Sequence, residues 1–330
     1  MAPEEFEGGT AVACVILGLS FLIGAPGNLL VIWTILRHVK HRSHTLVLIL
    51  HLAAADLLVL ITLPLWIYSL IQTWVFGGAT CKALVYIISV CMFSSISIIT
   101  LMSVERFLAI CHPFVMMRWK VKSVQNRCLV PLWVLAFLLG VPALLTQPLV
   151  ETDGTEQCFI KEFRSVTQEI IFLCLKTLGG FVVPFIILGI CYCLIAAQLR
   201  KTSYNSKHKS MVLVHTVVIA FTLCWLPYHI IEIIDLVCIL GSGREHECVP
   251  QSIVFSSGAL VFVSSSVNPI LYVFLARNLQ GSLKESRLVR LFQEMATHTN
   301  KLRELVVQKQ TGQRAANTQV ELMSDPCEKN

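Results

Sequence analysis

The sequence predicts an all-α membrane protein, a seven-transmembrane helix bundle followed by a short amphipathic eighth helix. Of its 330 residues, 55% are hydrophobic and only 14% are charged, whereas soluble proteins average about 25% charged residues. The mean hydropathy is +0.71. A soluble protein with a large core does not need apolar runs this long and this evenly spaced, so the composition favours a chain that crosses a membrane several times.

Seven apolar runs are long enough to cross a bilayer, which takes about 20 residues of helix. In order they are Thr10–Leu36, Thr45–Ile71, Cys81–Ile110, Cys128–Leu149, Ile170–Leu199, Met211–Leu240 and Val249–Leu275. Each is expected to be a helix, because a helix satisfies its own backbone hydrogen bonds in lipid. Residues 10–275 then form the seven-helix bundle, and residues 1–9 form a short N-terminal segment outside it.

The chain beyond the seventh run divides into two parts. Residues 276–292 are predicted to form an amphipathic helix on the inner leaflet, because leucines alternate there with basic side chains. Residues 293–330 are expected to be a largely disordered cytoplasmic tail. Several hydroxyls in these two parts are candidate kinase sites: Ser282, Ser286, Thr297, Thr299 and Thr318.

Basic residues set the expected orientation. They gather in the loops after the first, third and fifth runs and in the tail, and such loops face the cytoplasm. The N-terminus is therefore expected outside the cell. The first ten residues are acidic and lack a signal-peptide pattern, so the first run is expected to act as its own insertion signal. The net charge of +6 reflects the excess of basic residues on the expected cytoplasmic side, and no nucleic-acid partner is expected.

Asp56 lies near the middle of the second run. A charged side chain at the bilayer centre costs at least about 2.5–3.5 kcal/mol, so such residues normally face a protein interior. Asp56 is either a buried carboxyl held by hydroxyls or a sodium or proton site. Its candidate partners are Ser95, Ser264, Ser265 and Asn268, which supply the oxygen ligands that hard cations prefer.

Glu105 and Arg106 end the third run. They form either a local ion pair at the cytoplasmic edge or a latch that releases Arg106 to a cytoplasmic partner. Pro184, Pro227 and Pro269 each interrupt a backbone hydrogen bond inside a run. The resulting kinks are either packing adjustments or pivots of a moving helix.

Two cysteines differ in their positions from the others, which are interpreted as small buried hydrophobic residues. Cys81 opens the third run and Cys158 lies in the outer loop after the fourth, where an oxidising compartment would let them pair. Cys238 and Cys248 flank the last outer loop, and the sequence leaves open whether they also pair.

Taken in chain order, short motifs on the seven runs resemble the rhodopsin-like (class A) G-protein-coupled receptors, from Thr10 to about Phe292. The motifs are Gly27–Asn28, Leu-Ala-x-x-Asp ending at Asp56, Cys81 with Glu105–Arg106–Phe107, Trp133, Pro184 with Tyr192, Cys224–Trp225–Leu226–Pro227, and Asn268–Pro269–Ile270–Leu271–Tyr272. The resemblance implies a multi-pass plasma-membrane receptor and no enzyme activity. It also implies a disulfide between Cys81 and Cys158.

The resemblance also implies residue roles. Trp225 is expected to act as a toggle beneath the ligand at the Pro227 bend, and Tyr192 and Tyr272 are expected to swing inward on activation. Arg106, paired with Glu105 at rest, is expected to contact the G protein. The sequence departs from the family where span six begins, because Lys207 and Lys209 offer no acidic lock for Arg106.

A sodium ion is the one bound metal that the resemblance implies. Asp56, Ser95, Ser264 and Asn268 are expected to hold it as an allosteric ion in the resting state. No other cofactor is expected.

Within this family the segments FTLCWLPYHIIEI and FVSSSVNPILYVF look most like those of leukotriene B receptors, in the chemoattractant and lipid-mediator group. This similarity implies an acidic lipid ligand, an inhibitory G protein, and a role in chemotaxis and inflammation, with arrestin and receptor kinases as further partners. The sequence departs from the group in the pocket: the group tends to place Arg, Glu and Arg where this chain has Gln147, Lys176 and Val254.

The outer half of the bundle contains the candidate ligand contacts. Lys176 is a buried lysine that needs an anion, which is either Glu232 or the carboxylate of a ligand. Tyr228 and His229 lie above the Pro227 bend. His229 is read as a ligand contact, with a helix-to-helix hydrogen bond as the alternative. The predicted ligand-binding set is Lys176, Tyr228, His229, Glu232, Tyr86 and Gln147.

Other classes of ligand and function fit the sequence less well. Ile88 stands where amine receptors carry an aspartate, and Phe262 stands where opsins carry a lysine. Another oxidised fatty acid or a small chemoattractant peptide remains an alternative ligand. A transporter is disfavoured because the seven runs lack inverted repeats, and an enzyme is disfavoured because no nucleophile–base pair or metal-ligand spacing appears.

Overall fold

Seven helical segments that are long and apolar enough to cross a membrane form the computed structural model of this chain, as the sequence predicts. Their bounds are Gly9–His38, His44–Ile71, Gly77–Cys111, Cys128–Leu145, Val166–Gln198, Val218–Gly241 and Ser252–Val273. The structure describes residues 3–39, 43–112, 115, 122–145, 147–150, 156–163, 165–201, 208–242, 249–277, 288–293 and 295.

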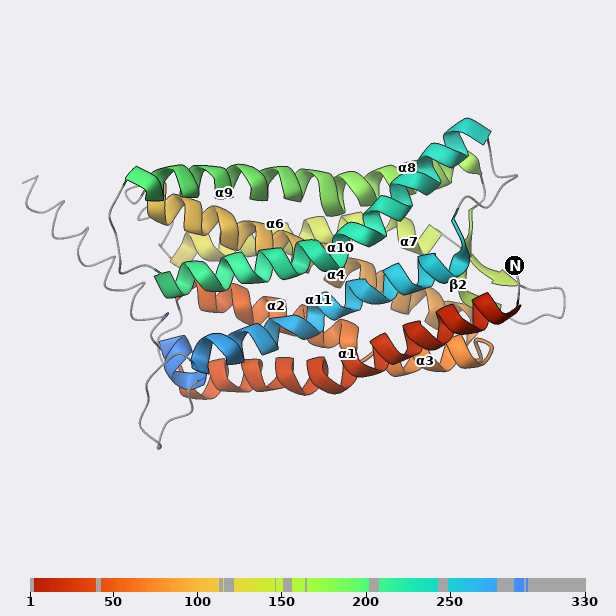
Figure 1. The fold of residues 1–330 in the computed structure, drawn as a ribbon, viewed down its shortest axis with the longest axis horizontal. Helices are drawn as coiled ribbons and strands as arrows, with labels where there is room; N and C mark the ends of the chain where they lie inside the picture. Colours follow the sequence, from red (N-terminus) through yellow and green to blue (C-terminus); the bar gives the residue numbers. More distant parts are fainter. Residues whose placement is uncertain are drawn as a thin grey trace, which may run out of the picture.

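Ten α-helices, one π-helical turn and two strands make up the described part of the chain. They are α1 (Pro3–His38), α2 (His44–Leu60), α3 (Leu63–Ile71), α4 (Gly77–Cys111), α6 (Lys122–Gly140), α7 (Pro142–Leu145), β1 (Gln147–Val150), β2 (Glu156–Glu162), α8 (Val166–Thr177), η1 (Leu178–Val182), α9 (Val183–Lys201), α10 (His208–Ser242) and α11 (Gln251–Arg277). The long helices run side by side as one bundle, with the N-terminus and β2 at one end and the close of α9 at the other (Figure 1). We call the end that carries β1 and β2 the sheet end.

Helix α4 is the central element of the bundle. It packs against α2, α6, α9 and α10, and it also contacts both strands. Helix α1 closes one side by packing against α2 and α11, and α11 packs in turn against α10. This arrangement places parts of α4, α8, α10 and α11 around a shared interior at the sheet end.

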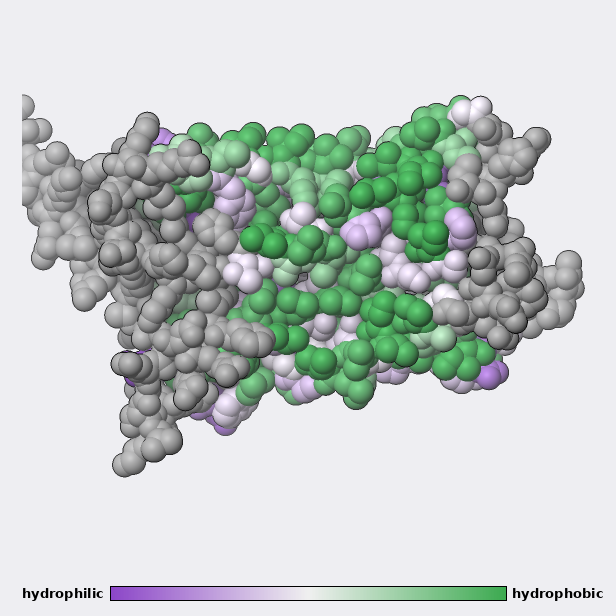
Figure 2. All heavy atoms as spheres, viewed as in Figure 1, coloured by the Kyte–Doolittle hydropathy of each residue, from purple (hydrophilic) through white to green (hydrophobic). Residues whose placement is uncertain are grey.

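The bundle carries its large apolar side chains on the outside as well as in its core. Leu22, Val130 and Leu223 are each about two-thirds exposed, and apolar side chains cover much of the face shown in Figure 2. A soluble protein rarely exposes so large an apolar surface, whereas hydrocarbon requires it. The chain is therefore a multi-pass membrane protein.

Three predicted spans differ from the structure in detail. The second is two helices, α2 and α3, separated by a turn at Ile61 and Thr62 with Pro64 in the first turn of α3. The fourth ends at Leu145, because residues 147–150 are strand β1, which pairs antiparallel with β2. The fifth contains the π-helical turn Leu178–Val182, and Pro184 lies two residues after it.

The N-terminal and C-terminal segments also differ from the predicted bounds. Helix α1 begins at Pro3, inside the segment expected to precede the bundle, and α11 runs on to Arg277. Residues 288–293 are helical, and Leu288, Leu291 and Phe292 are buried against the core. Residues 278–287 and the predicted tail from 296 onward lie outside the described residues.

The disulfide that the family resemblance implies is present. Cys81 at the start of α4 is bonded to Cys158 in β2, with their Cα atoms 5.8 Å apart. The bond ties the short sheet to the mouth of the bundle. Cys238 in α10 is also disulfide-bonded, while Cys248 lies outside the described residues.

Candidate functional site

A cavity of about 260 Å³ opens among the helices at the sheet end. Its walls come from α1, α3, α4, α6, α7, α8, η1, α10 and α11, and Cys158 of β2 also lines it. Most of the lining side chains are apolar, including Leu17, Met92, Leu175 and Phe262. Lys176 is the only lining lysine among the described residues. A concave, mostly apolar site with a few polar groups is the usual form of a small-molecule pocket.

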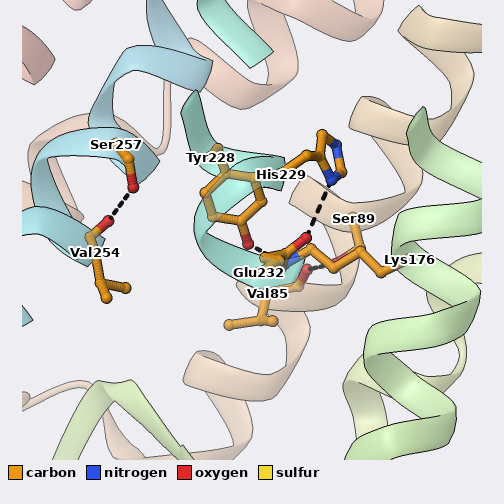
Figure 3. Close-up of polar contacts among 8 residues, drawn as sticks. All are labelled: Val85, Ser89, Lys176, Tyr228, His229, Glu232, Val254 and Ser257. Carbon is orange, nitrogen blue, oxygen red and sulfur yellow. Dashed lines mark hydrogen bonds and ion pairs between the residues drawn. The ribbon is translucent and has the colours of Figure 1, made fainter. Parts of the chain in front are cut away.

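The polar groups of the cavity form one cluster between α8 and α10 (Figure 3). The Nζ atom of Lys176 lies 2.5 Å from Glu232 Oε1 and also donates to the hydroxyl of Tyr228. The same ammonium lies over the Tyr228 ring, 4.5 Å from its centroid. The Lys176 side chain is 25% exposed, whereas that of Glu232 is 8% exposed. Lys176 therefore has the internal partner that was one of its two predicted alternatives.

His229 is fully buried and lines the same cavity. Its ring stacks between Phe181, at 4.5 Å, and Trp225, at 5.6 Å. Its Nδ1 atom lies 3.2 Å from Glu232 Oε2 (Figure 3). Nε2 is buried and has no hydrogen-bond partner among the described residues, and the close contact between Nδ1 and Glu232 Oε2 does not have hydrogen-bond geometry either. The predicted helix-to-helix hydrogen bond of His229 is thus not found there.

The six predicted ligand contacts do not all reach the cavity. Lys176, Tyr228 and His229 line it, and Glu232 sits behind them as their shared partner. Tyr86 is not among the lining residues: its hydroxyl donates to the Phe137 carbonyl at 3.3 Å, so it joins α4 to α6. Gln147 is in β1, and its side chain lies outside the described residues.

Gly180 and Ser89 are among the cavity residues that the sequence reading missed. Gly180 lines the cavity from the π-helical turn, and Ser89 lines it from α4. Ser89 donates to its own helix, to the Val85 carbonyl at 2.8 Å. The pair Gly179–Gly180 just before Pro184 is the one signal in the sequence that marks an irregular turn there.

A second polar cluster surrounds Asp56 in the middle of the bundle. Ser95 donates to Asp56 Oδ1 at 3.2 Å, and the amide nitrogen of Asn268 donates to Oδ2 at 2.8 Å. All three side chains are buried. The fourth predicted member, Ser264, instead accepts a hydrogen bond from Trp225 Nε1 at 3.1 Å. The structure thus brings three of the four predicted sodium ligands together, whereas the fourth, Ser264, contacts Trp225 instead.

The Glu105–Arg106 pair is arranged differently from the prediction. Among the described residues Arg106 makes no ion pair with Glu105. Arg106 instead donates to the Thr45 hydroxyl at 2.6 Å, and Thr45 donates to both Glu105 oxygens at 3.2 Å. His44 Nδ1 also lies 3.2 Å from Glu105 Oε2. The reason is that the first turn of α2 packs at this point, so Thr45 bridges the two side chains.

The predicted switch residues lie along the interior between the two clusters. Trp225 is buried and stacks on Phe221 at 5.1 Å, and Pro227 lies within α10, which changes direction along its length in Figure 1. The Tyr192 hydroxyl is 3.4 Å from the Ser103 hydroxyl. Tyr272 is buried with its ring 6.0 Å from Phe292. Lys207 lies outside the described residues, as does the side chain of Lys209.

Seven spans, a disulfide between the third span and strand β2, and a pocket lined by a tryptophan two residues before a proline are the features of a seven-helix receptor. The chain matches the family of 7 transmembrane receptors of the rhodopsin family over residues 27–272, and it belongs to that family. Receptors of this family are not enzymes, so the expectation that the chain is not an enzyme is confirmed.

Three named receptors are similar to the chain over most of its length. Leukotriene B4 receptor 1 of Bos taurus is 33% identical over 296 residues, covering 88% of this chain and 84% of its own. Leukotriene B4 receptor 2 of Homo sapiens is 35% identical over 293 residues, covering 86% and 81%. Atypical chemokine receptor 3 of Canis lupus familiaris is 32% identical over 276 residues, covering 81% and 76%.

Proposed function

We propose that the chain is a plasma-membrane receptor for an acidic lipid mediator, either leukotriene B4 or another oxidised fatty acid. The observation that carries the proposal is a mostly apolar cavity with a single lysine in its described lining. An alkyl chain gains about 25 cal/mol for each Å² of apolar surface that the cavity walls remove from water. A peptide would need many more polar partners than these walls offer.

Lys176 is the proposed anchor for the ligand carboxylate. An ammonium carries three N–H donors, and described residues use two of them, Glu232 and Tyr228. The third makes no hydrogen bond to a described residue, and the partly exposed Lys176 side chain lines the cavity. A ligand carboxylate would join Glu232 on the same ammonium, and the buried cluster supplies no other cation among the described residues.

Activation is proposed to pass from the cavity to α10. Tyr228, His229 and Trp225 all line the cavity and all belong to this helix, close to Pro227. An agonist must bind the active arrangement of α10 more tightly than the resting one. The N-terminus and the cavity then face outward, and the end that carries Arg106 faces a heterotrimeric G protein of the inhibitory type. Arrestin and receptor kinases would act on the tail.

The function test measures inhibitory G-protein activation in cells that express the chain. Leukotriene B4 and a panel of hydroxy fatty acids are titrated on the wild type and on Lys176→Ala. Lys82→Ala is the matched control, because Lys82 lies in α4 near the same end but does not line the cavity. We expect a response that Lys176→Ala reduces at least about tenfold, the effect of about 1.4 kcal/mol, and that Lys82→Ala leaves unchanged.

The other outcomes of this test are equally informative. A lipid response that Lys176→Ala does not change would return Lys176 to a purely structural pairing with Glu232. Silence to every lipid would contradict the proposed ligand class. It would turn the search to a small chemoattractant peptide, which the similarity to a chemokine receptor makes the next candidate.

An allosteric sodium ion is proposed for the Asp56 cluster. Asp56 and Ser95 present carboxylate and hydroxyl oxygens at one buried point, where the Asn268 amide nitrogen donates to Asp56, and Na⁺ prefers oxygen ligands. Because a ligand that binds the folded state stabilises it, sodium chloride should raise the Tm of the purified receptor above its value in choline chloride. Asp56→Asn should remove that difference. A sodium effect that persists in Asp56→Asn would contradict the ion site.

A further inference from the structure

We infer that His229 and Gly180 form a subsite that recognises a hydroxyl group on the proposed lipid ligand and rejects a ketone at the same carbon. The inference rests on the proposed function, since it concerns the same cavity. It concerns a second polar group of the ligand, a hydroxyl, in addition to the carboxylate that Lys176 is proposed to bind. The observations are the fixed ring of His229, its buried Nε2 atom, and the position of Gly180 beside that ring in the cavity wall.

The orientation of the imidazole is determined by its neighbours. Phe181 and Trp225 stack on the His229 ring with interplanar angles of 23° and 18°. The ring therefore has no freedom to turn out of its plane while both neighbours stay in place. Nδ1 faces Glu232 Oε2 at 3.2 Å (Figure 3), and the ring edge at Cε1 faces Gly180.

The contact to Glu232 determines the hydrogen-bonding character of the other nitrogen. A neutral imidazole has one N–H donor and one acceptor nitrogen, and a carboxylate beside one nitrogen draws the proton to it. Glu232 already carries the charge that balances Lys176, so its second oxygen favours an N–H on Nδ1. Nε2 is then an acceptor. It is fully buried and lacks a partner among the described residues, and leaving such an atom unpaired costs about 1–3 kcal/mol.

Gly180 lies beside the same imidazole ring and lines the same cavity. The π-helical turn Leu178–Val182 brings Gly180 to the cavity wall, and such turns occur often at functional sites. A Cβ atom at Gly180 would lie 3.3 Å from Phe93 Cε1 and 3.9 Å from His229 Cε1. Even a methyl group would therefore take up part of the room beside His229, and a larger side chain would fill it.

These features together select one ligand chemistry. A hydroxyl donates to Nε2, whereas a ketone oxygen would place an acceptor against an acceptor. His229 and Glu232 are three residues apart on α10, so the hydroxyl site and the Lys176 anchor are separated by slightly less than one helical turn, ~4.5 Å along the helix axis. The expected ligand carries its hydroxyl several carbons away from the carboxylate, inside the apolar part of the cavity.

The test uses three matched sets of twenty-carbon polyunsaturated acids: hydroxy acids whose single hydroxyl moves along the chain, the oxo acids with a ketone at the same carbon, and the parent acid. Binding is measured by competition on the full-length receptor in membranes, with labelled leukotriene B4 as the probe. For one hydroxyl position, the hydroxy acid is expected to bind about tenfold or more better than its oxo and parent partners, a difference of about 1.4 kcal/mol.

Two substitutions assign that preference to the subsite. His229→Phe keeps a stacking ring but removes Nε2, so the hydroxy and oxo acids should bind equally. Gly180→Ala should weaken the preferred hydroxy acid more than the parent acid. Gly179→Ala is the control in the same turn, because its Cβ would meet Leu139 at an ordinary contact distance of 3.6 Å; Gly179 does not line the cavity, and this variant should match the wild type.

The possible negative results separate a failure of the hydroxyl subsite from a failure of the proposed function. Wild-type binding of hydroxy and oxo acids with equal affinity at every position, or a preference that His229→Phe leaves intact, would overturn the hydroxyl subsite while leaving the lipid receptor standing. Absence of binding by leukotriene B4 and by every acid in the panel would overturn the proposed function, and the subsite with it.

Discussion

The two sides of the bundle differ in how closely glycine lets their elements approach. Between α1 and α11, glycine lets the helices touch: a Cβ at Gly24 would lie 2.7 Å from Ser266 Cβ, and one at Gly27 would lie 2.8 Å from Pro269 Cβ. Between η1, α4 and α10 the approach is less close: a Cβ at Gly180, which lines the cavity, would lie 3.3 Å from the side-chain atom Phe93 Cε1. The first pair of helices forms a closed frame, and the second region forms a hollow.

The polar side chains follow the same division. In the frame, Asn28 Nδ2 donates to two backbone carbonyls, those of Gly24 and Ser265, each at 2.9 Å. In the hollow, Lys176, Tyr228, Glu232 and His229 bond chiefly to one another. Backbone carbonyls are fixed by their helices, whereas side chains can exchange partners. The frame is therefore expected to stay constant while the hollow responds to a ligand.

The largest expected effect comes from leaving a charge unpaired in the hollow. Lys176→Met removes the partner of Glu232, a side chain that is 8% exposed, and breaking a buried ion pair on one side costs about 3–5 kcal/mol. The Tm of the purified ligand-free receptor should fall accordingly.

The double substitution Lys176→Met with Glu232→Leu is the control for that result. It removes both charges, and replacing a buried ion pair by apolar groups is often neutral or stabilising. The Tm should therefore return most of the way to the wild-type value. A double variant that melts as low as Lys176→Met would show that packing, and not the unpaired charge, causes the loss.

The next effect is smaller and belongs to the frame. Gly24→Ala places a methyl group 2.9 Å from the Cα atom of Ser266, and backbone cannot move aside as a flexible side chain can. Overpacking of this kind costs about 1–3 kcal/mol, so the receptor should melt at a lower temperature. Agonist affinity, corrected for the amount of folded receptor, should not change.

Gly18→Ala is the matched control in the same helix. A Cβ at Gly18 would have no atom within 4 Å, and alanine is favoured over glycine in a helix by roughly 0.5–1 kcal/mol. Gly18→Ala should therefore leave the Tm unchanged or raise it slightly. If Gly18→Ala and Gly24→Ala lower the Tm equally, the close approach of α1 and α11 does not hold the frame together.

The frame was more predictable from the sequence than the hollow. Hydropathy and length place the membrane spans to within a few residues, because hydrocarbon thickness sets the length of each helix. The predicted fourth span ran too far, since Leu149 and Val150 continue its apolar run although residues 147–150 form a strand. An apolar run of four residues cannot be assigned to a helix or a strand by its pattern alone.

The direction of individual side chains was the part that the sequence could not predict. A membrane helix is apolar all round, so the periodicity that marks the inner face of a soluble helix is weak. Tyr86 therefore appeared as a ligand contact, although it bonds to α6. Gly180 was missed because the π-helical turn that rotates it inward depends on packing, and Thr45 was missed because its bridge joins residues 60 positions apart.

The smallest expected effect lies where the two regions meet. Trp225 in α10 donates to the Ser264 hydroxyl in α11 at 3.1 Å, a bond between the responsive hollow and the helix that packs on α1. A hydrogen bond of this kind contributes about 0.5–1.5 kcal/mol. Ser264→Ala removes the acceptor without removing the Cβ atom. If the bond holds α10 in its resting arrangement, ligand-independent G-protein activation should rise, and about 1 kcal/mol corresponds to roughly fivefold.

Ser266→Ala makes this measurement specific. The Ser266 hydroxyl donates to the Val263 carbonyl at 2.8 Å, as the Ser264 hydroxyl donates to the Val261 carbonyl at 2.7 Å. The two variants therefore lose the same bond within their own helix, and only Ser264→Ala also loses the contact to Trp225. Basal signalling, normalised to receptor at the cell surface, should rise in Ser264→Ala alone. An equal rise in both variants would assign the effect to α11 itself, and the hollow would then move independently of the frame.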